Sequence, residues 1–256
     1  MSSSRLPGKV MKPLAGKPVI WHIYTRAEQC KLVDKVIVAT SKDKTDDPLV
    51  KYCEINGLNV YRGSLNNVLS RFIEILNSTD YSYYVRITGD CPLIYPPFID
   101  AQIDALATFE ADAIWSKRES SVLEGQGVHS IHSLLYIWNK SSNPEDQEHV
   151  GSIYLTEHPE EFKIVQISIP EIFTQYPFRL TIDEEKDYEF LTRIYNNLYT
   201  GNDTPDLPGV INWLLKNEDV VDINKDISHK SLNLRLKELR RKWNDCRPVG
   251  KAKFTL

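Results

Sequence analysis

Short apolar segments alternate with amphipathic segments along the first hundred residues. Residues 36–40, 58–61 and 83–87 are brief runs predicted to be strands, and the β-branched, apolar run at 36–40 is typical of a strand buried on both faces of a parallel sheet. A helix is predicted to begin at Asp47 as N-cap, with Pro48 as its first residue. Two further helices are indicated by apolar residues at helical spacing: Val68, Leu69, Phe72, Ile73 and Leu76, and then Ile99, Ile103, Leu106 and Ala107.

This alternation predicts an α/β fold with a Rossmann-like, doubly wound and mostly parallel sheet. In such sheets, ligands bind at the carboxyl ends of the strands. The polar loops that follow Thr40, Tyr61 and Ile87 are therefore predicted to share one rim. We expect the functional site on that rim.

The second half of the chain has a less regular pattern. Strands are predicted at residues 111–115, 162–169 and 179–182, and helices at residues 130–139, 145–158, 184–200 and 230–243. The last helix is expected to direct four large apolar side chains inward: Leu232, Leu236, Leu239 and Trp243. Because no repeat or low-complexity linker divides the chain, residues 1–256 are predicted to form a single domain.

Composition and charge exclude several classes of protein. The chain is 41% hydrophobic and 26% charged, which is ordinary for a globular protein. A net charge of -4 argues against broad nucleic-acid binding, and no run is long and apolar enough for a membrane span. The four cysteines are scattered without a CxxC pair, so neither a zinc site nor a disulfide framework is expected. Since the first residues also lack the apolar run of a secretory signal, we expect a cytoplasmic protein.

The first candidate segment for chemistry is residues 2–9. Ser3, Ser4 and Gly8 leave backbone N–H groups accessible, and the cations Arg5 and Lys9 frame them. Such a loop can wrap a triphosphate, although the spacing is not that of a Walker loop. A flexible basic tail is the alternative interpretation.

Two aspartates at the ends of predicted strands form the other candidates. Asp90 follows residues 83–87, and Asp183 follows residues 179–182. Carboxylates at strand ends are well placed to hold Mg²⁺ for phosphoryl chemistry. The alternatives are an Asx-turn at Asp90 and a simple helix N-cap at Asp183.

Taken together and in order, these segments resemble motifs of the acylneuraminate cytidylyltransferase family, especially its branch of spore-coat polysaccharide biosynthesis protein F-like members. The resemblance runs from Ser2 to about Asn224. It rests on six motifs: Ser3 to Val10, Val38 to Ser41, Arg62-Gly63-Ser64 with Val68, Leu69 and Arg71, Arg86 to Leu93, Glu148-His149-Val150, and Arg179 to Asp183 with Asp187.

The resemblance implies a nucleotidyltransferase fold, similar to that of GT-A enzymes, that transfers CMP from CTP to an acidic sugar and releases pyrophosphate for surface polysaccharide synthesis. It implies that Arg5 and Lys9 bind the phosphates of CTP and that Asp90 and Asp183 hold Mg²⁺. It also implies that residues 62–71 line the nucleotide pocket, through Arg62, Gly63, Ser64 and Arg71. An inserted α+β segment at about 110–177 is expected to form a homodimer contact, and residues 230–256 a C-terminal helix and tail.

The sequence departs from this family pattern at its start. Members carry a hydrophobic strand ending in Ala-Arg just ahead of the position of Met1, and that strand normally lies in the middle of the sheet. Its absence from the sequence predicts two unpaired sheet edges. We therefore expect the natural chain to begin upstream of Met1.

Smaller departures leave the substrate open, and two alternatives to cytidylyl transfer also stay open. Tyr95 replaces an aspartate often seen in the family, and residues 127–131 stand where relatives often have an acidic residue. One alternative is a GT-A-type glycosyltransferase that uses a nucleotide-sugar, although Asp90-Cys91-Pro92 lacks the second aspartate of a DxD pair. The other alternative is a non-catalytic relative that binds nucleotide.

Overall fold

The computed structural model describes residues 5–116, 120–201, 205–227, 243 and 246–256. Two strands near the N-terminus, β3 (Val38–Ser41) and β4 (Val60–Gly63), pair in parallel. The helix α2 (Asp47–Ile55) connects them, and α3 (Val68–Leu76) leads from β4 to β5 (Tyr83–Ile87). This strand–helix–strand succession is the doubly wound beginning that the sequence predicts.

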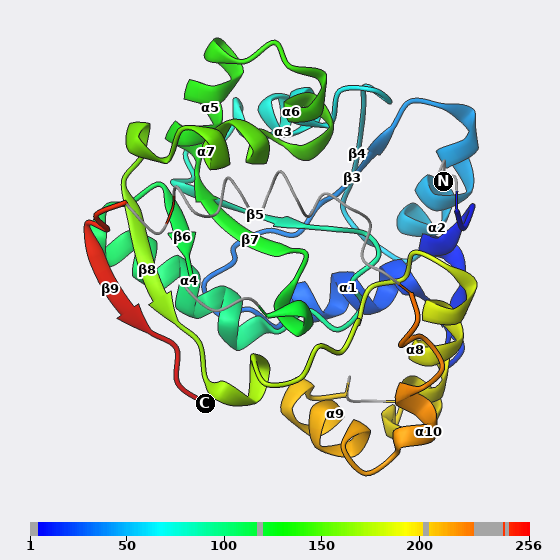
Figure 1. Ribbon diagram of the computed structural model, residues 1–256. Coiled ribbons are helices and arrows are strands. Elements are labelled where there is room, and N and C mark those ends of the chain that lie inside the picture. The colour runs from blue at the N-terminus through cyan, green and yellow to red at the C-terminus, as the bar shows by residue number, and fades with distance from the viewer. Residues whose placement is uncertain (1–4, 117–119, 202–204, 228–242, 244–245) are drawn as a thin grey trace.

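A five-stranded mixed sheet forms the centre of the molecule (Figure 1). Its order is β5-β7-β6-β8-β9, with β7 (Gln126–Ser130), β6 (Ala113–Trp115), β8 (Ile164–Ser168) and β9 (Gly250–Lys253). Only β7 runs antiparallel to its neighbours, because β6 pairs in parallel with β8 and β8 with β9. The prediction of an α/β fold with a mostly parallel sheet is confirmed.

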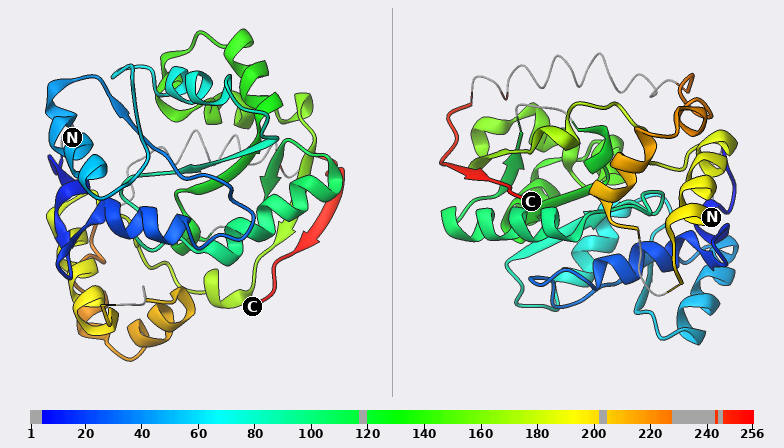
Figure 2. Two further views of the ribbon diagram at one scale, coloured as in Figure 1. Left: turned by 180° about the vertical axis from the view of Figure 1, so that it is seen from behind. Right: turned by 90° about the horizontal axis from the view of Figure 1, so that it is seen from below.

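Helices cover both faces of this sheet, as the views in Figures 1 and 2 show. The helices α1 (Val19–Ala27) and α4 (Pro96–Phe109) lie on one face. On the other face, α3 packs with α5 (Ile131–Lys140) and α6 (Pro144–His149) around the buried Tyr84 and Leu134. The helix α7 (Ser152–Glu157) follows on that side.

The remaining elements surround the loop at the start of the chain. A short hairpin, β1 (Pro13–Leu14) and β2 (Lys17–Pro18), precedes α1. The hairpin packs against α8 (Glu185–Leu198), which is followed by α9 (Leu207–Leu214) and α10 (Glu218–Val221). The large core cluster joins these helices to α1 and α4.

Several local predictions were wrong in detail. The helix predicted over residues 145–158 is two helices, because Val150 and Gly151 adopt positive φ angles of 56° and 74° between them. Residues 179–182 form no strand among the described residues. The N-cap of α2 is Asp46, not Asp47. Ala107, which was placed with the apolar residues at helical spacing, is exposed on α4. Of the predicted last helix, the structure describes only Trp243, which is buried and donates a hydrogen bond to the Thr156 carbonyl at 3.1 Å.

The sheet is interrupted between β3 and β5. In the part of the chain that the structure describes, no strand pairs with the second edge of either one. This agrees with the expectation of two unpaired sheet edges.

Candidate functional site

A single ammonium group joins the three segments that the sequence singled out. Lys9 Nζ donates hydrogen bonds to Asp90 Oδ2 at 2.7 Å and to Asp183 Oδ1 at 3.1 Å. It also donates to the Ile182 carbonyl at 2.7 Å. Lysine 9 is only 13% exposed, so these contacts form in a partly desolvated setting, where charge interactions are stronger than in water. The structure thus brings Lys9, Asp90 and Asp183 into one cluster.

Arg5 supplies a second cation to the same cluster. Its guanidinium lies 2.9 Å from Asp183 Oδ1 and 3.6 Å from Glu184 Oε1. Gly8, with a φ of 68°, turns the chain between the two cations at the start of a short 3₁₀ helix, Lys9–Met11. A residue with a side chain would be strained in this left-handed conformation, so the turn explains the glycine. Ser3 and Ser4 lie outside the described residues.

Asp90 reaches the cluster from the carboxyl end of β5. The Thr88 N–H donates to the Gly125 carbonyl at 3.0 Å, which ends the pairing of β5 with β7. The Ile182 N–H donates to the Asp90 carbonyl at 2.8 Å. This backbone bond fixes the segment before Asp183 against the segment that carries Asp90, and it explains why the two carboxylates meet although residues 179–182 form no strand.

Asp183 is held by a buried network that the sequence did not predict. Asp187 is fully buried and accepts hydrogen bonds from Arg179 Nε at 2.9 Å and from the backbone N–H groups of Asp183 and Glu184 at 3.0 Å each. Arg179 in turn contacts Asp183 Oδ2 at 2.7 Å. Glu184 is the N-cap of α8, so the interpretation of Asp183 as an N-cap does not hold. The signal available in the sequence was the Asp187 position of the Arg179 motif.

The charges around Asp183 determine its protonation. Burial alone raises the pKa of a carboxyl group, but Lys9 outweighs it, with Arg5 and Arg179, and the pKa of Asp183 lies below its usual value. Asp183 is therefore ionised at neutral pH. An ionised carboxylate can exchange an ammonium partner for a metal ion.

The residues predicted to line the nucleotide pocket lie on a neighbouring part of the rim. Arg62, in β4, donates to the Ser41 carbonyl at 2.9 Å and pairs with Asp47 at 2.7 Å, which ties β4 to the end of β3 and to the start of α2. Ser64 accepts a hydrogen bond from the Asn67 N–H at 3.1 Å. None of these groups contacts the cluster formed by Lys9, Asp90 and Asp183 in the described part of the chain.

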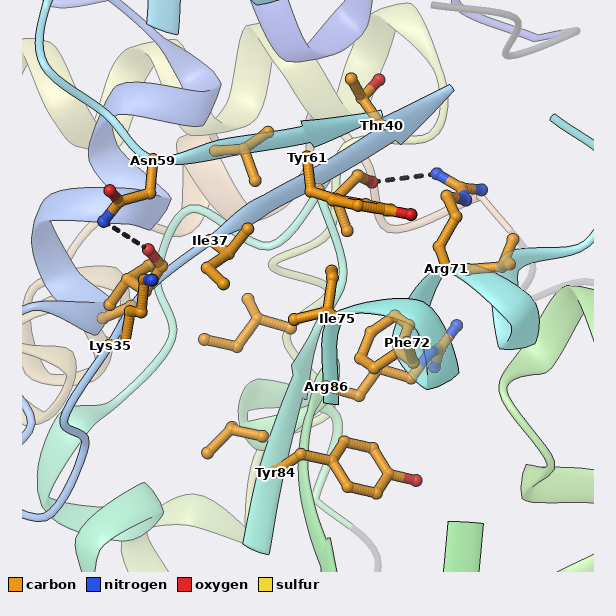
Figure 3. Close-up of a pocket in the computed structure, with 18 of the residues that line it drawn as sticks. Lys35, Ile37, Thr40, Asn59, Tyr61, Arg71, Phe72, Ile75, Tyr84 and Arg86 are labelled. Carbon is orange, nitrogen blue, oxygen red and sulfur yellow. Dashed lines mark hydrogen bonds between the residues drawn. The ribbon is translucent and has the colours of Figure 1, made fainter. Parts of the chain in front are cut away.

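Gly63 and Arg71 are in close contact on the same part of the rim. A Cβ atom at position 63 would lie 2.5 Å from Arg71 Cγ, so a glycine is required for this approach. Arg71 donates from α3 to the Ala39 carbonyl at 2.9 Å (Figure 3). Arg71 also lines a cavity that extends to Lys9 and Asp90.

A magnesium ion fits the chemistry of the carboxylate pair. Asp90 and Asp183 are close enough to share one ammonium group, and both are about a quarter exposed, at 24% and 23%. Mg²⁺ is characteristically bound by one or two carboxylates together with substrate phosphates and water. The one group of three metal-ligating side chains among the described residues, His158, Glu160 and Glu161, lies elsewhere. The pair therefore suits a metal that arrives with a nucleotide.

Arg86 is a further cation near the site, and no role was predicted for it from the sequence. It stands on β5, four residues before Asp90, and lines the same cavity. No ion pair joins it to a carboxylate of the described residues, and burial lowers its pKa. The neighbouring His129 on β7 has a buried Nδ1 without a hydrogen-bond partner in the described part of the chain.

Two cations, Arg5 and Lys9, and two carboxylates, Asp90 and Asp183, thus meet near the carboxyl end of β5, and this composition suits a nucleoside triphosphate with its metal ion. The chain belongs to the cytidylyltransferase family, whose model matches residues 1–205. It is therefore a CTP-using nucleotidyltransferase. The described residues include no helix with the length and apolar character that a bilayer crossing requires.

Similar proteins are found over most of the chain. The spore coat polysaccharide biosynthesis protein SpsF of Bacillus subtilis (strain 168) is 32% identical over 227 residues, which cover 86% of this chain and 92% of that protein. A solved cytidylyltransferase from Leptospira borgpetersenii serovar Hardjo-bovis (strain JB197) superposes with a TM-score of 0.79 at 25% identity, over 90% of this chain and 95% of that one. A 3-deoxy-manno-octulosonate cytidylyltransferase of Haemophilus influenzae (strain PittGG) is 35% identical over 112 residues, or 43% and 44% of the two chains.

Proposed function

We propose that the protein transfers CMP from CTP to a hydroxyl group of an acidic sugar, with Mg²⁺ as cofactor, for surface polysaccharide synthesis. The observation that carries this proposal is the position of Lys9, which bonds to Asp90 and to Asp183 from a loop that also presents Arg5. The cluster combines carboxylates for a cation with cations for phosphate. Those are the components that nucleotidyl transfer requires.

In the reaction, the oxygen of the acceptor hydroxyl forms a bond to the α-phosphorus of CTP. The bond from that phosphorus to the bridging oxygen of the β-phosphate breaks, and pyrophosphate leaves with the electron pair while the hydroxyl proton passes to solvent. Arg5 and Lys9 would bind phosphate oxygens and neutralise charge on the leaving pyrophosphate. When bound by Asp90 and Asp183, Mg²⁺ would neutralise phosphate charge and lower the pKa of the acceptor hydroxyl.

This function requires Lys9 to exchange partners. Its ammonium group lies against the two carboxylates that would hold the metal. On binding of CTP with Mg²⁺, the ammonium group of Lys9 would leave Asp90 and Asp183, which would then hold the ion, and would turn to the phosphates. The flexible stem of lysine permits that change without movement of the backbone.

The acidic nature of the acceptor is supported by Arg86 and by two relatives. Arg86 is a half-buried cation that lines the cavity beside Asp90 and makes no ion pair among the described residues. A carboxylate would neutralise it in a bidentate contact. The named substrate of the Haemophilus influenzae relative is an acidic sugar, and the name of the Bacillus subtilis relative places it in polysaccharide synthesis. The segment at 110–177 is our candidate for a homodimer contact.

The test is the identity of the products. The protein is incubated with CTP, Mg²⁺ and a panel of acidic sugars, and ³¹P NMR follows the phosphorus. Cytidylyl transfer produces pyrophosphate and a CMP-sugar phosphodiester in equal amounts. A GT-A-type glycosyltransferase would instead release nucleotide from a nucleotide-sugar and form no pyrophosphate from CTP. A non-catalytic relative would bind CTP without forming either product.

The role of Arg86 is tested in the same assay. Arg86→Met is expected to raise KM for the acidic sugar at least roughly tenfold, because a charge-assisted hydrogen bond contributes about 1.5–3 kcal/mol. KM for CTP should change much less. An equal rise in both constants would contradict contact between Arg86 and the acceptor.

A further inference from the structure

The segment that carries Asp90 is buried but has no regular secondary structure. In the described chain, residues 88–95 lie between the end of β5 and the start of α4 and belong to neither a helix nor a strand. Residues 91–95 are all buried. Buried backbone N–H and C=O groups need hydrogen-bond partners, and a segment outside helices and strands must find them elsewhere. The position of Asp90 therefore depends on the groups that hold this segment.

A tyrosine from α8 holds the first part of the segment. The Tyr195 hydroxyl donates a hydrogen bond to the Pro92 carbonyl at 2.8 Å, across 103 positions of the chain. Tyr195 is fully buried, and burial raises its pKa to about 12, so the hydroxyl keeps its proton and remains a donor. Because Pro92 closely follows Asp90 in the chain, this bond fixes the backbone next to the carboxylate.

An arginine from α1 holds the second part of the segment. Arg26 is only 2% exposed, and its Nη1 donates to the Ile94 carbonyl at 2.9 Å. Its Nη2 donates to the Pro205 carbonyl, which lies just ahead of α9. The ring of His22, also on α1, lies 4.5 Å from the ring of Tyr195. The helices α1 and α8 thus support the segment together.

The helix that carries Tyr195 also holds the backbone of Asp183. Asp187, in the first turn of α8, accepts hydrogen bonds from the N–H groups of Asp183 and Glu184 at 3.0 Å each. Tyr195 follows about two turns further along the helix, and both side chains are fully buried. One helix is therefore attached to the backbone at Asp183 and to the backbone beside Asp90.

A direct backbone bond joins the two attached segments. The Ile182 N–H donates to the Asp90 carbonyl at 2.8 Å, so any shift of one segment against the other must strain or break this bond. Two carboxylates that share a metal ion need a defined separation, because Mg²⁺ demands near-ideal octahedral geometry. The Ile182 N–H therefore reports whether that separation is kept.

We propose that Tyr195 and Arg26 are positioning residues for Asp90, and that α8 sets the separation of Asp90 and Asp183 through Tyr195 and Asp187. Tyr195 and Arg26 act on the backbone of residues 92–94 rather than on the cluster around Lys9. The metal that the two carboxylates would hold comes from the proposed function, on which this inference rests. The support of the backbone does not depend on that metal.

The variant Tyr195→Phe tests this assignment, because it removes only the hydroxyl group that donates to the Pro92 carbonyl. The matched control is Tyr83→Phe. It also removes a tyrosine hydroxyl that donates to a main-chain carbonyl, that of Leu106 at 3.1 Å, but at the end of β5 away from Asp90. Three quantities are measured for both variants and for the unmodified protein: the urea midpoint, the hydrogen-exchange rate of the Ile182 N–H, and the Mg²⁺ concentration for half-maximal pyrophosphate release.

Tyr195→Phe is expected to speed exchange of the Ile182 N–H roughly tenfold or more, beyond what its change in urea midpoint accounts for. It should also raise the Mg²⁺ concentration for half-maximal release roughly tenfold or more, the usual effect of losing a group that orients a metal ligand. Tyr83→Phe should change neither quantity.

Unchanged exchange of the Ile182 N–H in Tyr195→Phe would overturn the proposal. An unchanged Mg²⁺ requirement in that variant would overturn it as well, and so would equal effects of the two variants. If the unmodified protein released no pyrophosphate, or released it without Mg²⁺, the proposed function would fail. The exchange rates would still decide whether Tyr195 holds the segment that carries Asp90.

Discussion

Lys9 Nζ lies 2.7 Å from Asp90 Oδ2, although the two residues are 81 positions apart. The contact joins the loop at the start of the chain to the carboxyl end of β5. The same nitrogen also reaches Asp183, beyond a further stretch of the chain. The cluster is thus assembled from three distant segments, and each member can be removed without deleting an element of the fold.

Replacement of Lys9 tests two roles of its ammonium group: binding the phosphates of CTP and neutralising the carboxylates of Asp90 and Asp183. Lys9→Gln is expected to lower the turnover of CTP by about 10²–10³, the usual effect of losing one charge-stabilising donor. The same change removes a cation from the carboxylates. Binding of Mg²⁺ in the absence of CTP should therefore tighten, as measured by calorimetry. Weaker binding of Mg²⁺ by this variant would show that Asp90 and Asp183 do not hold the metal.

Asp187 is expected to stabilise the fold and to position Asp183. Asp187→Asn removes the charge of a fully buried carboxylate that accepts hydrogen bonds from Arg179, Asp183 and Glu184. Removing one partner of a buried ion pair costs about 3–5 kcal/mol, so urea unfolding should show a loss of that order. The control Asp222→Asn breaks an exposed pair with Lys225 and should cost less than about 1 kcal/mol. Equal losses in the two variants would contradict the role of the buried network.

His129 makes the stability depend on pH. Burial, together with Arg86, lowers the pKa of His129 to about 4 from its ordinary value of 6.5. The unfolded chain therefore binds this proton at a higher pH than the folded chain does. The stabilising contribution is complete above pH 6.5 and is lost as the pH falls from 6.5 towards 4, by at most about 1.4 kcal/mol per pH unit for one proton.

The variant His129→Gln identifies the group responsible. Between pH 6.5 and 4, its free energy of unfolding should fall less steeply than that of the unmodified protein, in denaturant titrations at several pH values. Parallel curves would show that another group titrates. His22, whose pKa burial also lowers, is the second candidate.

The absence of a side chain at Gly63 leaves room for the side chain of Arg71 to pack against the backbone of β4. In Gly63→Ala the new Cβ atom would stand 2.5 Å from Arg71 Cγ, which forces the arginine to shift. Overpacking of this kind costs about 1–3 kcal/mol, and the change should also raise KM for CTP if Arg71 lines the nucleotide pocket. Gly209→Ala is the control, because its Cβ atom meets only ordinary contacts at 3.8 Å, and its thermal midpoint should not fall. An unchanged midpoint in Gly63→Ala would contradict the close packing.

Local sequence patterns predicted most elements of the first hundred residues, because each carries its own periodicity. β5 occupies residues 83–87 as predicted, and α3 begins at Val68. The antiparallel strand β7 was not predicted, since residues 126–130 combine glycine and polar residues whose pairing depends on their neighbours. The break at Val150 was missed because nothing in its side chain favours a positive φ.

In the candidate site, single residues could be predicted from the local sequence, but the contacts between them could not. Asp90 and Asp183 could be singled out one at a time, as carboxylates after apolar runs. Their sharing of Lys9 depends on tertiary contacts that no local pattern carries. The same holds for the support of Asp183 by Asp187, which itself accepts a hydrogen bond from the distant Asn224. The resemblance to a family connected the segments, but the distances come only from the fold.

The central claim is that Asp90 and Asp183 hold the metal for transfer of CMP. The direct test is the rate of Mg²⁺-dependent pyrophosphate release from CTP with the accepted sugar, for Asp90→Asn, Asp183→Asn and the exposed control Asp219→Asn. Both site variants are expected to lose at least about 10² in rate, and the control to keep the rate of the unmodified protein. Pyrophosphate release at the unmodified rate by either site variant would contradict it.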